Sequence, residues 1–406
     1  ALESKRLRNS IIISILAGIA TGITALAWGG VVYILVAIGG YALFELLLLK
    51  FSRRDFYVYS LWAILTLGIM LTIGSGRYNI SVLTSSITTA LILFSFLFAL
   101  ITFLIYHKNI LNIKHKLEKI NFPLSLSMLF ITVLITILLT SILYGPLFFF
   151  NVIYGNLGEV VNPQQTDRWS LTVAENHAVF IVDWFNDFGQ ILVWLLVIAS
   201  IWLFYDMVKN IDKYKWKLTF VYTLFMLGFI FSRYSASSIL NGSSVLSYIA
   251  LYGSVILIIS YFAYVYFYTF IKDKESFSQI SNMDKKYTII FIWFLLSIVG
   301  AKFLARLVFS FSPLVCLLFA FLVFSLVDYL KNSNSIKNKN VKVVSYVILG
   351  LMIAYLFFGF LKTTLAAAAS VGPMYNVEWQ QAERWVKANT PENSVFVHWW
   401  DYGYLV

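Results

Sequence analysis

The sequence predicts an all-α polytopic membrane protein with about eleven transmembrane helices and the start of an extracytoplasmic α/β domain. Of its 406 residues, 60% are hydrophobic and only 12% are charged, whereas a soluble domain has about 25% charged residues. Spanning a bilayer takes about 20 apolar residues. Eleven apolar runs follow one another: 11–28, 31–49, 57–73, 83–106, 123–150, 189–208, 218–235, 245–270, 288–308, 313–330 and 343–365.

The composition also excludes several classes of protein. So apolar a chain is neither an ordinary cytosolic enzyme nor a disordered tail. The net charge of +11 does not indicate a nucleic-acid partner, because apolar runs separate the basic residues and leave no single basic patch. Cys316 is the only cysteine, so the chain has no internal disulfide.

The positive charges predict the orientation of the chain. Of the 30 Lys and Arg residues, 22 lie before the first run or in the loops that follow the second, fourth, sixth, eighth and tenth runs. Such residues stay on the cytoplasmic side of a membrane. The remaining loops therefore face outward, as does the end of the chain. We expect residues 1–365 to be the transmembrane domain, with an external loop at 151–187, and residues 366–406 to begin the extracytoplasmic domain.

Both long outward segments contain signs of ordered structure. The loop 151–187 combines charged residues with aromatic ones, and loops of this length in compact proteins are usually functional or disordered. Residues 377–388 have the pattern of an amphipathic helix, which Asn389-Thr390-Pro391 ends. Val395-Phe396-Val397 then predicts a buried strand.

Three cations lie near the predicted outer ends of apolar runs. Arg306 is a functional candidate, because an arginine in or near hydrocarbon is costly unless it is paired, and its planar fork suits a pyrophosphate. The alternative is that it snorkels to the lipid headgroups. Lys302 lies one helix turn earlier and could pair with Glu45 or with another buried acid. Arg233 has a weaker claim of the same kind as Arg306.

Several motifs resemble one enzyme family. The run WWDYG at 399–403 resembles the motif of the catalytic subunit of oligosaccharyltransferase, here of archaeal-like type. The stretch 379–404 is similar to the start of that family's extracytoplasmic domain. Thr172-Val173-Ala174-Glu175 resembles the family's TIXE-type motif in its long external loop. Ala305-Arg306-Leu307, followed by Ser312-Pro313, is similar to its late transmembrane arginine.

The chain departs from the family in being incomplete. The resemblance implies a membrane domain of thirteen helices with two acidic external segments near its start, one of them Asp-x-Asp-like. No Asp-x-Asp occurs in this sequence. Family members also continue well beyond WWDYG, whereas this chain stops at Val406. We therefore expect a fragment that lacks N-terminal helices and most of the soluble domain, and that is inactive alone.

The resemblance implies a function and a set of site residues. Members transfer an oligosaccharide from a dolichyl or polyprenyl (pyro)phosphate to Asn in Asn-x-Ser/Thr, using Mn²⁺ or Mg²⁺. Glu175 would be the catalytic glutamate and a metal ligand, the other ligands lying upstream of this chain. Arg306 would bind the lipid-linked donor. Trp399, Trp400 and Asp401 would bind the hydroxyl of the acceptor sequon.

The implied partners are a lipid-linked oligosaccharide, an acceptor polypeptide and membrane lipid, without nucleic acid; accessory subunits are left open. The protein would lie in the cell membrane of a prokaryote or the endoplasmic reticulum of a eukaryote, with its active site on the extracytoplasmic side.

Other interpretations stay open. Glu175 could be a solvated loop acid, and the two tryptophans could belong to an interfacial aromatic belt. Another polyprenyl-phosphate-dependent membrane glycosyltransferase would have a similar helical body, but it reads no sequon and does not need WWDYG. A transporter is less favoured. It calls for ionisable residues near the middle of several spans or for broken helices, and the chain has only 6 Pro.

Overall fold

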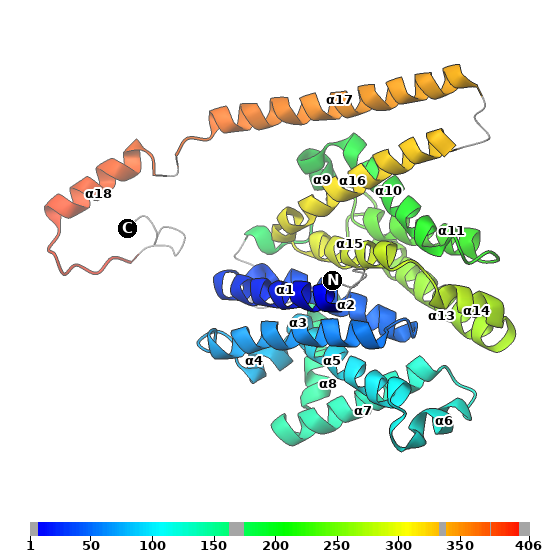
Figure 1. The fold of residues 1–406 in the computed structure, drawn as a ribbon. Coiled ribbons are helices and arrows are strands. Elements are labelled where there is room, and N and C mark those ends of the chain that lie inside the picture. Colours follow the sequence, from blue (N-terminus) through cyan, green and yellow to red (C-terminus); the bar gives the residue numbers. More distant parts are fainter. Residues whose placement is uncertain (1–6, 162–173, 333–337, 374, 398–406) are drawn as a thin grey trace. The chain divides into compact units, whose positions relative to one another are not determined.

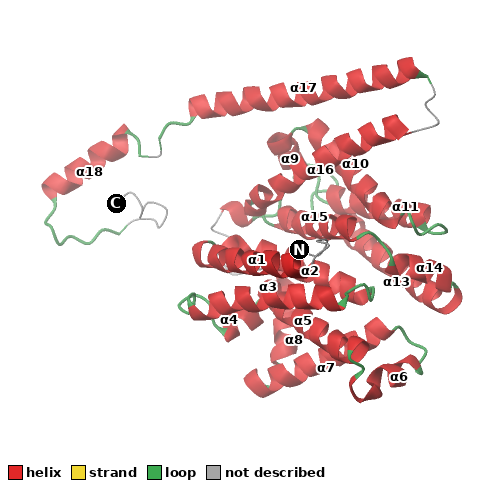
Figure 2. Ribbon diagram, viewed as in Figure 1, coloured by secondary structure: helices red, strands yellow, loops and turns green. Residues whose placement is uncertain are grey.

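The structure, a computed structural model, describes residues 7–161, 174–332, 338–373 and 375–397. Helices are the regular elements of these ranges, and the described residues contain no β-strand, only an isolated bridge between Arg233 and Asn241 (Figures 1 and 2). The chain divides into two compact units, 1–322 and 323–406, which are described separately.

Ten helical segments among the described residues are long and apolar enough to cross a membrane, which indicates an integral membrane protein. They coincide with ten of the eleven apolar runs of the sequence. The eleventh run corresponds to α11 (Lys215–Phe231), whose 17 residues are at the short end of spanning lengths, so the count of eleven stays a prediction. The ten segments are α1 (Leu7–Ala27), η1 with α2 (Gly29–Leu47), α3 (Arg53–Thr72), α5 with η2 (Ile87–His107), α7 (Leu124–Tyr144), α10 (Gln190–Val208), α12, η7 and α13 (Val245–Lys272), α15 (Lys285–Phe303), α16 (Arg306–Asn332) and α17 (Lys339–Ser370).

Shorter helices lie between these segments, and one of them corrects the sequence prediction. The apolar run 123–150 is two helices, because α7 ends at Gly145, where φ is +99° and Pro146 follows. α8 (Phe148–Val161) then occupies the first part of the predicted loop 151–187. The other short helices are α4 (Ile80–Ser85), α6 (Ile113–Glu118), α9 (Ile181–Phe188), α14 (Lys274–Ser281) and α18 (Val377–Asn389).

A tight turn joins the first two spans. Trp28 is extended, and the short helix η1 (Gly29–Val31) leads directly into α2 (Val32–Leu47). A Cβ on Gly30 would lie 2.0 Å from the Trp28 ring, so a larger residue there would require the ring to move. A small residue also lets α1 approach α3 closely, since Gly18 lies against the backbone of Trp62. Such close contacts at small residues are common between transmembrane helices.

Loops that the sequence predicts to be cytoplasmic contact one another at one end of the first unit, here called the inner end. The Arg53 guanidinium donates to the carbonyl of His107 at 2.8 Å, which joins the loops after α2 and α5. Lys213 and Asp273 form an ion pair at 2.9 Å, which joins the loops after α10 and α13. The opposite end of the unit, predicted to face outward, is called the outer end.

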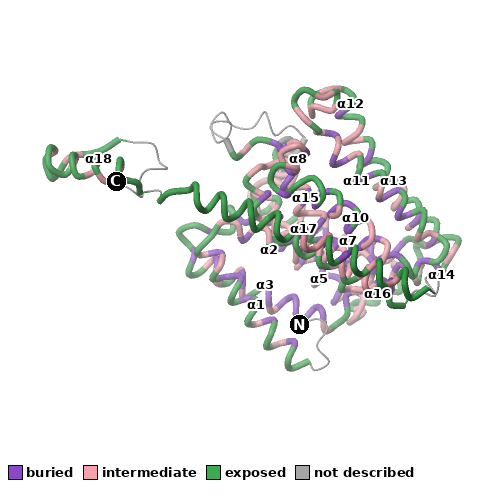
Figure 3. The backbone as a smooth tube through the Cα atoms, turned by 90° about the horizontal axis from the view of Figure 1, so that it is seen from above, coloured by how far each residue is buried: buried purple, intermediate pink, exposed green. Residues whose placement is uncertain are grey.

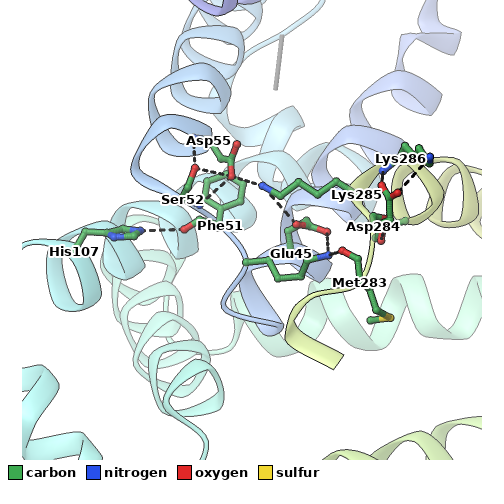
Figure 4. Close-up of polar contacts among 11 residues, drawn as sticks. Glu45, Phe51, Ser52, Asp55, His107, Met283, Asp284, Lys285 and Lys286 are labelled. Atoms are coloured by element: carbon green, nitrogen blue, oxygen red, sulfur yellow. Dashed lines mark hydrogen bonds and ion pairs between the residues drawn. The ribbon is translucent and has the colours of Figure 1, made fainter. Parts of the chain in front are cut away.

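A buried cluster of charges ties α2, α3 and α15 together at the inner end (Figure 4). Lys50 pairs with Glu45 at 3.2 Å, and both side chains are buried. Lys285 pairs with Asp55 at 2.5 Å. Asp55 and Ser52 form a capping box at the start of α3. The cluster holds the start of α15 beside the end of α2.

The buried residues of the first unit lie within its helices (Figure 3), and most of them are apolar. One aromatic cluster joins three helices, since Phe204 of α10 stacks on Tyr222 of α11 at 4.4 Å and contacts Phe291 of α15 at 5.3 Å. Aromatic pairs of this kind add about 0.5–1.5 kcal/mol each beyond the burial of their area. The packing holds α10, α11 and α15 together.

The second unit contains the amphipathic helix predicted over 377–388. Asn376 caps α18 by accepting a hydrogen bond from the backbone N–H of Trp379 at 3.0 Å. The strand predicted at 395–397 is absent, and Val395 and Val397 are 89% and 96% exposed. A lone strand leaves its backbone groups unpaired, and the described residues contain no second strand to pair with it. The α/β domain stays a prediction.

Candidate functional site

Part of the long outward loop is hydrogen-bonded to the corner between α15 and α16. Leu304 is extended and breaks the helix, so the polar backbone groups around it are free to pair elsewhere. The carbonyl of Lys302 accepts from the N–H of Val179 at 2.9 Å, and the N–H of Ala305 donates to the carbonyl of His177 at 3.0 Å. The loop therefore runs alongside this corner in an extended form.

The other side of the same segment is bonded to the end of α11. The N–H of Ile181 donates to the carbonyl of Arg233 at 3.0 Å. The Arg233 guanidinium donates to the carbonyl of Ala178 at 3.2 Å and lies 4.3 Å from the centre of the Phe180 ring. Asp183 lies close enough to Arg233 to interact with it electrostatically. Residues 177–182 are thus held from both sides.

Helix α9 completes the outer end. Asp183 accepts from the backbone N–H of Phe180 at 2.8 Å and so begins the helix. Trp184 is 3% exposed and lies 5.7 Å from Phe311 of α16, between ring centres. These contacts hold α9 against α16.

The structure brings the segments with two predicted site residues together. Glu175 lies in the short helix η6 (Ala174–Asn176) and is exposed. It stands two residues before His177, whose carbonyl is bonded to Ala305. Arg306 follows Ala305 and is also exposed. Glu175 and Arg306 are 131 positions apart in sequence, but the segments that carry them are hydrogen-bonded to each other at one end of the bundle.

Arg306 has a different local setting from the one expected. The sequence placed it near the end of the ninth apolar run, whereas the break at Leu304 makes it the first residue of α16. The N-terminus of a helix carries partial positive charge, which adds to that of the guanidinium. Arg306 also lies within electrostatic range of the Tyr33 hydroxyl in α2.

An apolar groove of about 690 Å³ lies beside this end of the first unit, between α2, α15 and α16. Its size is within the range of small-molecule sites. Phe309, one helix turn after Arg306, lies on its wall, and Ile289 lies near the inner end of α15, so the groove extends along the helices. It is lined by Trp28, Gly30, Tyr33, Ile34, Ala37, Ile38, Ile289, Trp293, Ser297, Phe309, Ser310, Ser312, Pro313 and Cys316.

Other predicted site residues lie outside the described part of the chain: Trp399, Trp400 and Asp401 of the WWDYG run, and Thr172 and Val173 of the loop motif. Within the described residues, no three His, Cys, Asp or Glu side chains are grouped closely enough to hold a metal ion. Glu175 is one carboxylate and does not by itself fit a metal site.

The partners of Lys302 escaped the sequence analysis. Lys302 does not pair with Glu45, which binds Lys50 at the inner end. Its ammonium instead donates to the carbonyl of Phe229 and to the hydroxyl of Ser232 at 2.8 Å. The only signal in the sequence was a lysine inside an apolar run, and this signal does not reveal that backbone carbonyls are its acceptors.

Comparison with known proteins gives one short match. A stretch of 36 residues is 50% identical to a dolichyl-phosphooligosaccharide-protein glycotransferase of Methanocaldococcus jannaschii. The stretch covers 9% of this chain and only 4% of the archaeal protein. No protein-family model matches the chain.

Proposed function

We propose that this chain is part of the catalytic subunit of a membrane oligosaccharyltransferase. Such an enzyme moves an oligosaccharide from a polyprenyl (pyro)phosphate to the Asn side chain of Asn-x-Ser/Thr. The observation that carries the proposal is the hydrogen bond between His177 and Ala305, which brings the segment of Glu175 beside Arg306. The WWDYG sequence at 399–403 and the 36-residue similarity to an archaeal glycotransferase support the choice of reaction.

The donor would bind along the groove and at Arg306. A polyprenyl chain is apolar, as are most of the groove's lining residues. Its phosphate would meet the Arg306 guanidinium at the electropositive N-terminus of α16, a setting that suits an anion. Arg306 would then stabilise the charge that develops on the phosphate when the bond to the sugar breaks.

The acceptor would be read by the WWDYG residues. Asp401 would accept a hydrogen bond from the Ser or Thr hydroxyl, and Trp399 and Trp400 would wall the pocket. The acceptor amide is a poor nucleophile because its lone pair is delocalised. Glu175 would accept from its N–H groups and orient it toward the sugar. The roles of the three WWDYG side chains are inferred from the sequence, because these side chains lie outside the described residues.

A requirement for Mn²⁺ or Mg²⁺ is a further part of the proposal, since carboxylates are the ligands that these ions prefer. Glu175 is the predicted ligand that lies in the described residues, and one carboxylate alone does not hold such an ion. Removing divalent ions with a chelator should abolish transfer, and adding back Mn²⁺ or Mg²⁺ should restore it. Full activity in excess chelator would contradict this part.

A different polyprenyl-phosphate-dependent glycosyltransferase is the second candidate, because the groove and Arg306 fit any such donor. The transporter has less support. Glu45, its main candidate for a deep charge, lies two residues from the end of α2 and is paired with Lys50 rather than facing a central cavity.

The discriminating experiment uses the product of the complete gene with a lipid-linked oligosaccharide and three peptides that differ in their acceptor residues. Mass spectrometry should find glycan on Asn in Asn-x-Thr, and none in Gln-x-Thr or Asn-x-Ala. Glycan on the Thr hydroxyl of the Gln-x-Thr peptide would favour the second candidate. No transfer to any peptide would reject the proposed reaction.

A further inference from the structure

Lys302 is a buried lysine to which the proposed reaction assigns no part. It is 4% exposed and lies one residue before the end of α15. Its ammonium donates to the carbonyls of Phe229 and Ile230 and to the hydroxyl of Ser232. These three acceptors match the three donors of a lysine. No ion pair joins Lys302 to a carboxylate within the described residues.

Two of the three acceptors are carbonyls in the last turn of a helix, and that of Phe229 also accepts from the Ser232 hydroxyl at 2.8 Å. Phe229 and Ile230 belong to the last turn of α11, which ends at Phe231. The last four carbonyls of a helix have no partner within it, and the helix dipole is negative there. A buried ammonium is costly unless all its donors are satisfied. The end of α11 therefore supplies hydrogen-bond acceptors to the Lys302 ammonium, and the ammonium supplies donors and positive charge to the end of α11. This interaction fixes the end of α11 beside the end of α15.

The two helix ends joined by Lys302 are the same two that hold the loop. On one side, Lys302 itself accepts from Val179 through its backbone carbonyl. On the other side, Arg233 follows Ser232 and is bonded to Ala178 and Ile181. A shift of α11 relative to α15 would pull these two sets of hydrogen bonds apart. The position of residues 177–182 depends on that spacing.

We propose that Lys302 is a positioning residue. It sets the position of residues 177–182, which directly follow the short helix of Glu175, relative to Arg306. It does so by holding the end of α11 against the α15–α16 corner, so that the segment 177–182 is bonded from both sides. The proposal rests on the proposed function only where it gives Glu175 and Arg306 a part in the reaction.

The first test measures the loop directly, without activity. Lys302→Met removes the ammonium and keeps a similar volume, and hydrogen exchange by mass spectrometry follows the amides of 177–183 in the complete protein. We expect these amides to exchange roughly ten- to a hundredfold faster, the effect of losing a hydrogen bond to a charged group. The matched control is Lys50→Met, which removes another buried ammonium at the inner end and should leave these amides unchanged.

Two results would overturn the proposal. One is unchanged exchange of 177–183 in Lys302→Met. The other is equal acceleration in Lys50→Met, which would mean that these amides exchange through global unfolding and not through local opening of the loop. If Lys302→Met does not fold, Ser232→Ala removes one of the three acceptors and keeps the ammonium. It should accelerate the same amides by a smaller factor, and unchanged exchange would again contradict the proposal.

The second test separates the positioning role from the proposed function. With a lipid-linked donor and an Asn-x-Thr peptide, Lys302→Met should lower kcat roughly ten- to a hundredfold and leave the KM for the peptide unchanged, because misplacing a reacting group costs turnover. Faster exchange with an unchanged kcat would show that the segment position does not matter to the reaction, and would reject the roles given to Glu175 and Arg306. If the wild type transfers nothing, the proposed function fails while the exchange result still decides the positioning role.

Discussion

Arg306 stands at the end of a helix where a cation is least expected. The N-terminus of α16 is electropositive, and its first turn has no acidic residue to compensate. The side chain is exposed rather than buried in a pair. Such an arrangement attracts an anion in a way that a snorkelling arginine in the middle of a helix does not, which is why a phosphate donor is the natural partner.

Replacing Arg306 tests this reading. Arg306→Ala should raise the KM for the lipid-linked donor and leave the KM for the acceptor peptide unchanged, with a cost of about 2–5 kcal/mol, as when one partner of a desolvated charge pair is lost. Arg306→Lys should rescue only part of the loss, because it lacks the planar fork. Arg77→Ala, at another predicted outer loop, is the control. Equal donor kinetics in Arg306→Ala and Arg77→Ala would show that Arg306 only meets headgroups.

Single residues were predictable where their chemistry is rare. An arginine or glutamate within an apolar or motif-bearing segment is conspicuous in the sequence, so Arg306 and Glu175 could be named. Lys302 was conspicuous too, but its acceptors are backbone carbonyls of Phe229 and Ile230, and every residue has a carbonyl. A partner without a distinctive side chain leaves no mark in the sequence.

At the scale of the elements, the charges at the inner end connect helices that are distant in the chain. Lys50 is buried, and burial lowers its pKa while Glu45 opposes the shift. Lys285 brings the start of α15 to Asp55 in α3. The cluster thus fixes the inner end of α15, as Lys302 fixes its outer end.

Breaking the cluster should destabilise the fold more than breaking an exposed pair. Lys50→Met leaves Glu45 buried without its nearest cation, which costs about 3–5 kcal/mol. Lys286→Met breaks the exposed pair with Asp284 and should cost about 0–1 kcal/mol. Thermal unfolding of the purified protein in detergent measures both. A similar midpoint for the two variants would show that the buried pair does not stabilise the structure.

Elements were predictable from the sequence where hydrophobicity decides them. Each apolar run overlaps a helix, and the helix at 377–388 followed from its amphipathic pattern and its stop sequence. The predictions were wrong where the backbone conformation of one residue, or the presence of a neighbouring strand, determines the secondary structure. Gly145 divided one run into two helices. The apolar triplet 395–397 did not form a strand, because a strand needs a second strand beside it.

For the whole molecule, the charge pattern predicts which loops lie on each side of the membrane. The structure is consistent with that pattern, since loops after α2, α5, α10 and α13 contact one another at the inner end. It describes no membrane, so the direction stays a prediction of the sequence.

Cysteine labelling in intact cells tests the orientation. In a Cys316→Ala background, a cysteine at Ser170 or Ser394 should react with a membrane-impermeant thiol reagent added from outside. A cysteine at Ser335 should react only after the membrane is opened, because its loop carries Lys331, Lys337, Lys339 and Lys342. Labelling at position 335 from outside would overturn the arrangement of spans.

The central claim is that the protein selects its acceptor by the hydroxyl of a sequon. The most direct measurement compares transfer to Asn-x-Thr, Asn-x-Ser and Asn-x-Ala peptides by the product of the complete gene and by its Asp401→Ala variant. The wild type should prefer Thr and Ser over Ala, and the variant should lose roughly ten- to a hundredfold of that preference, the value of one hydrogen bond to a charged group. Undiminished selectivity in Asp401→Ala, or a wild type that uses Asn-x-Ala equally well, would contradict the account.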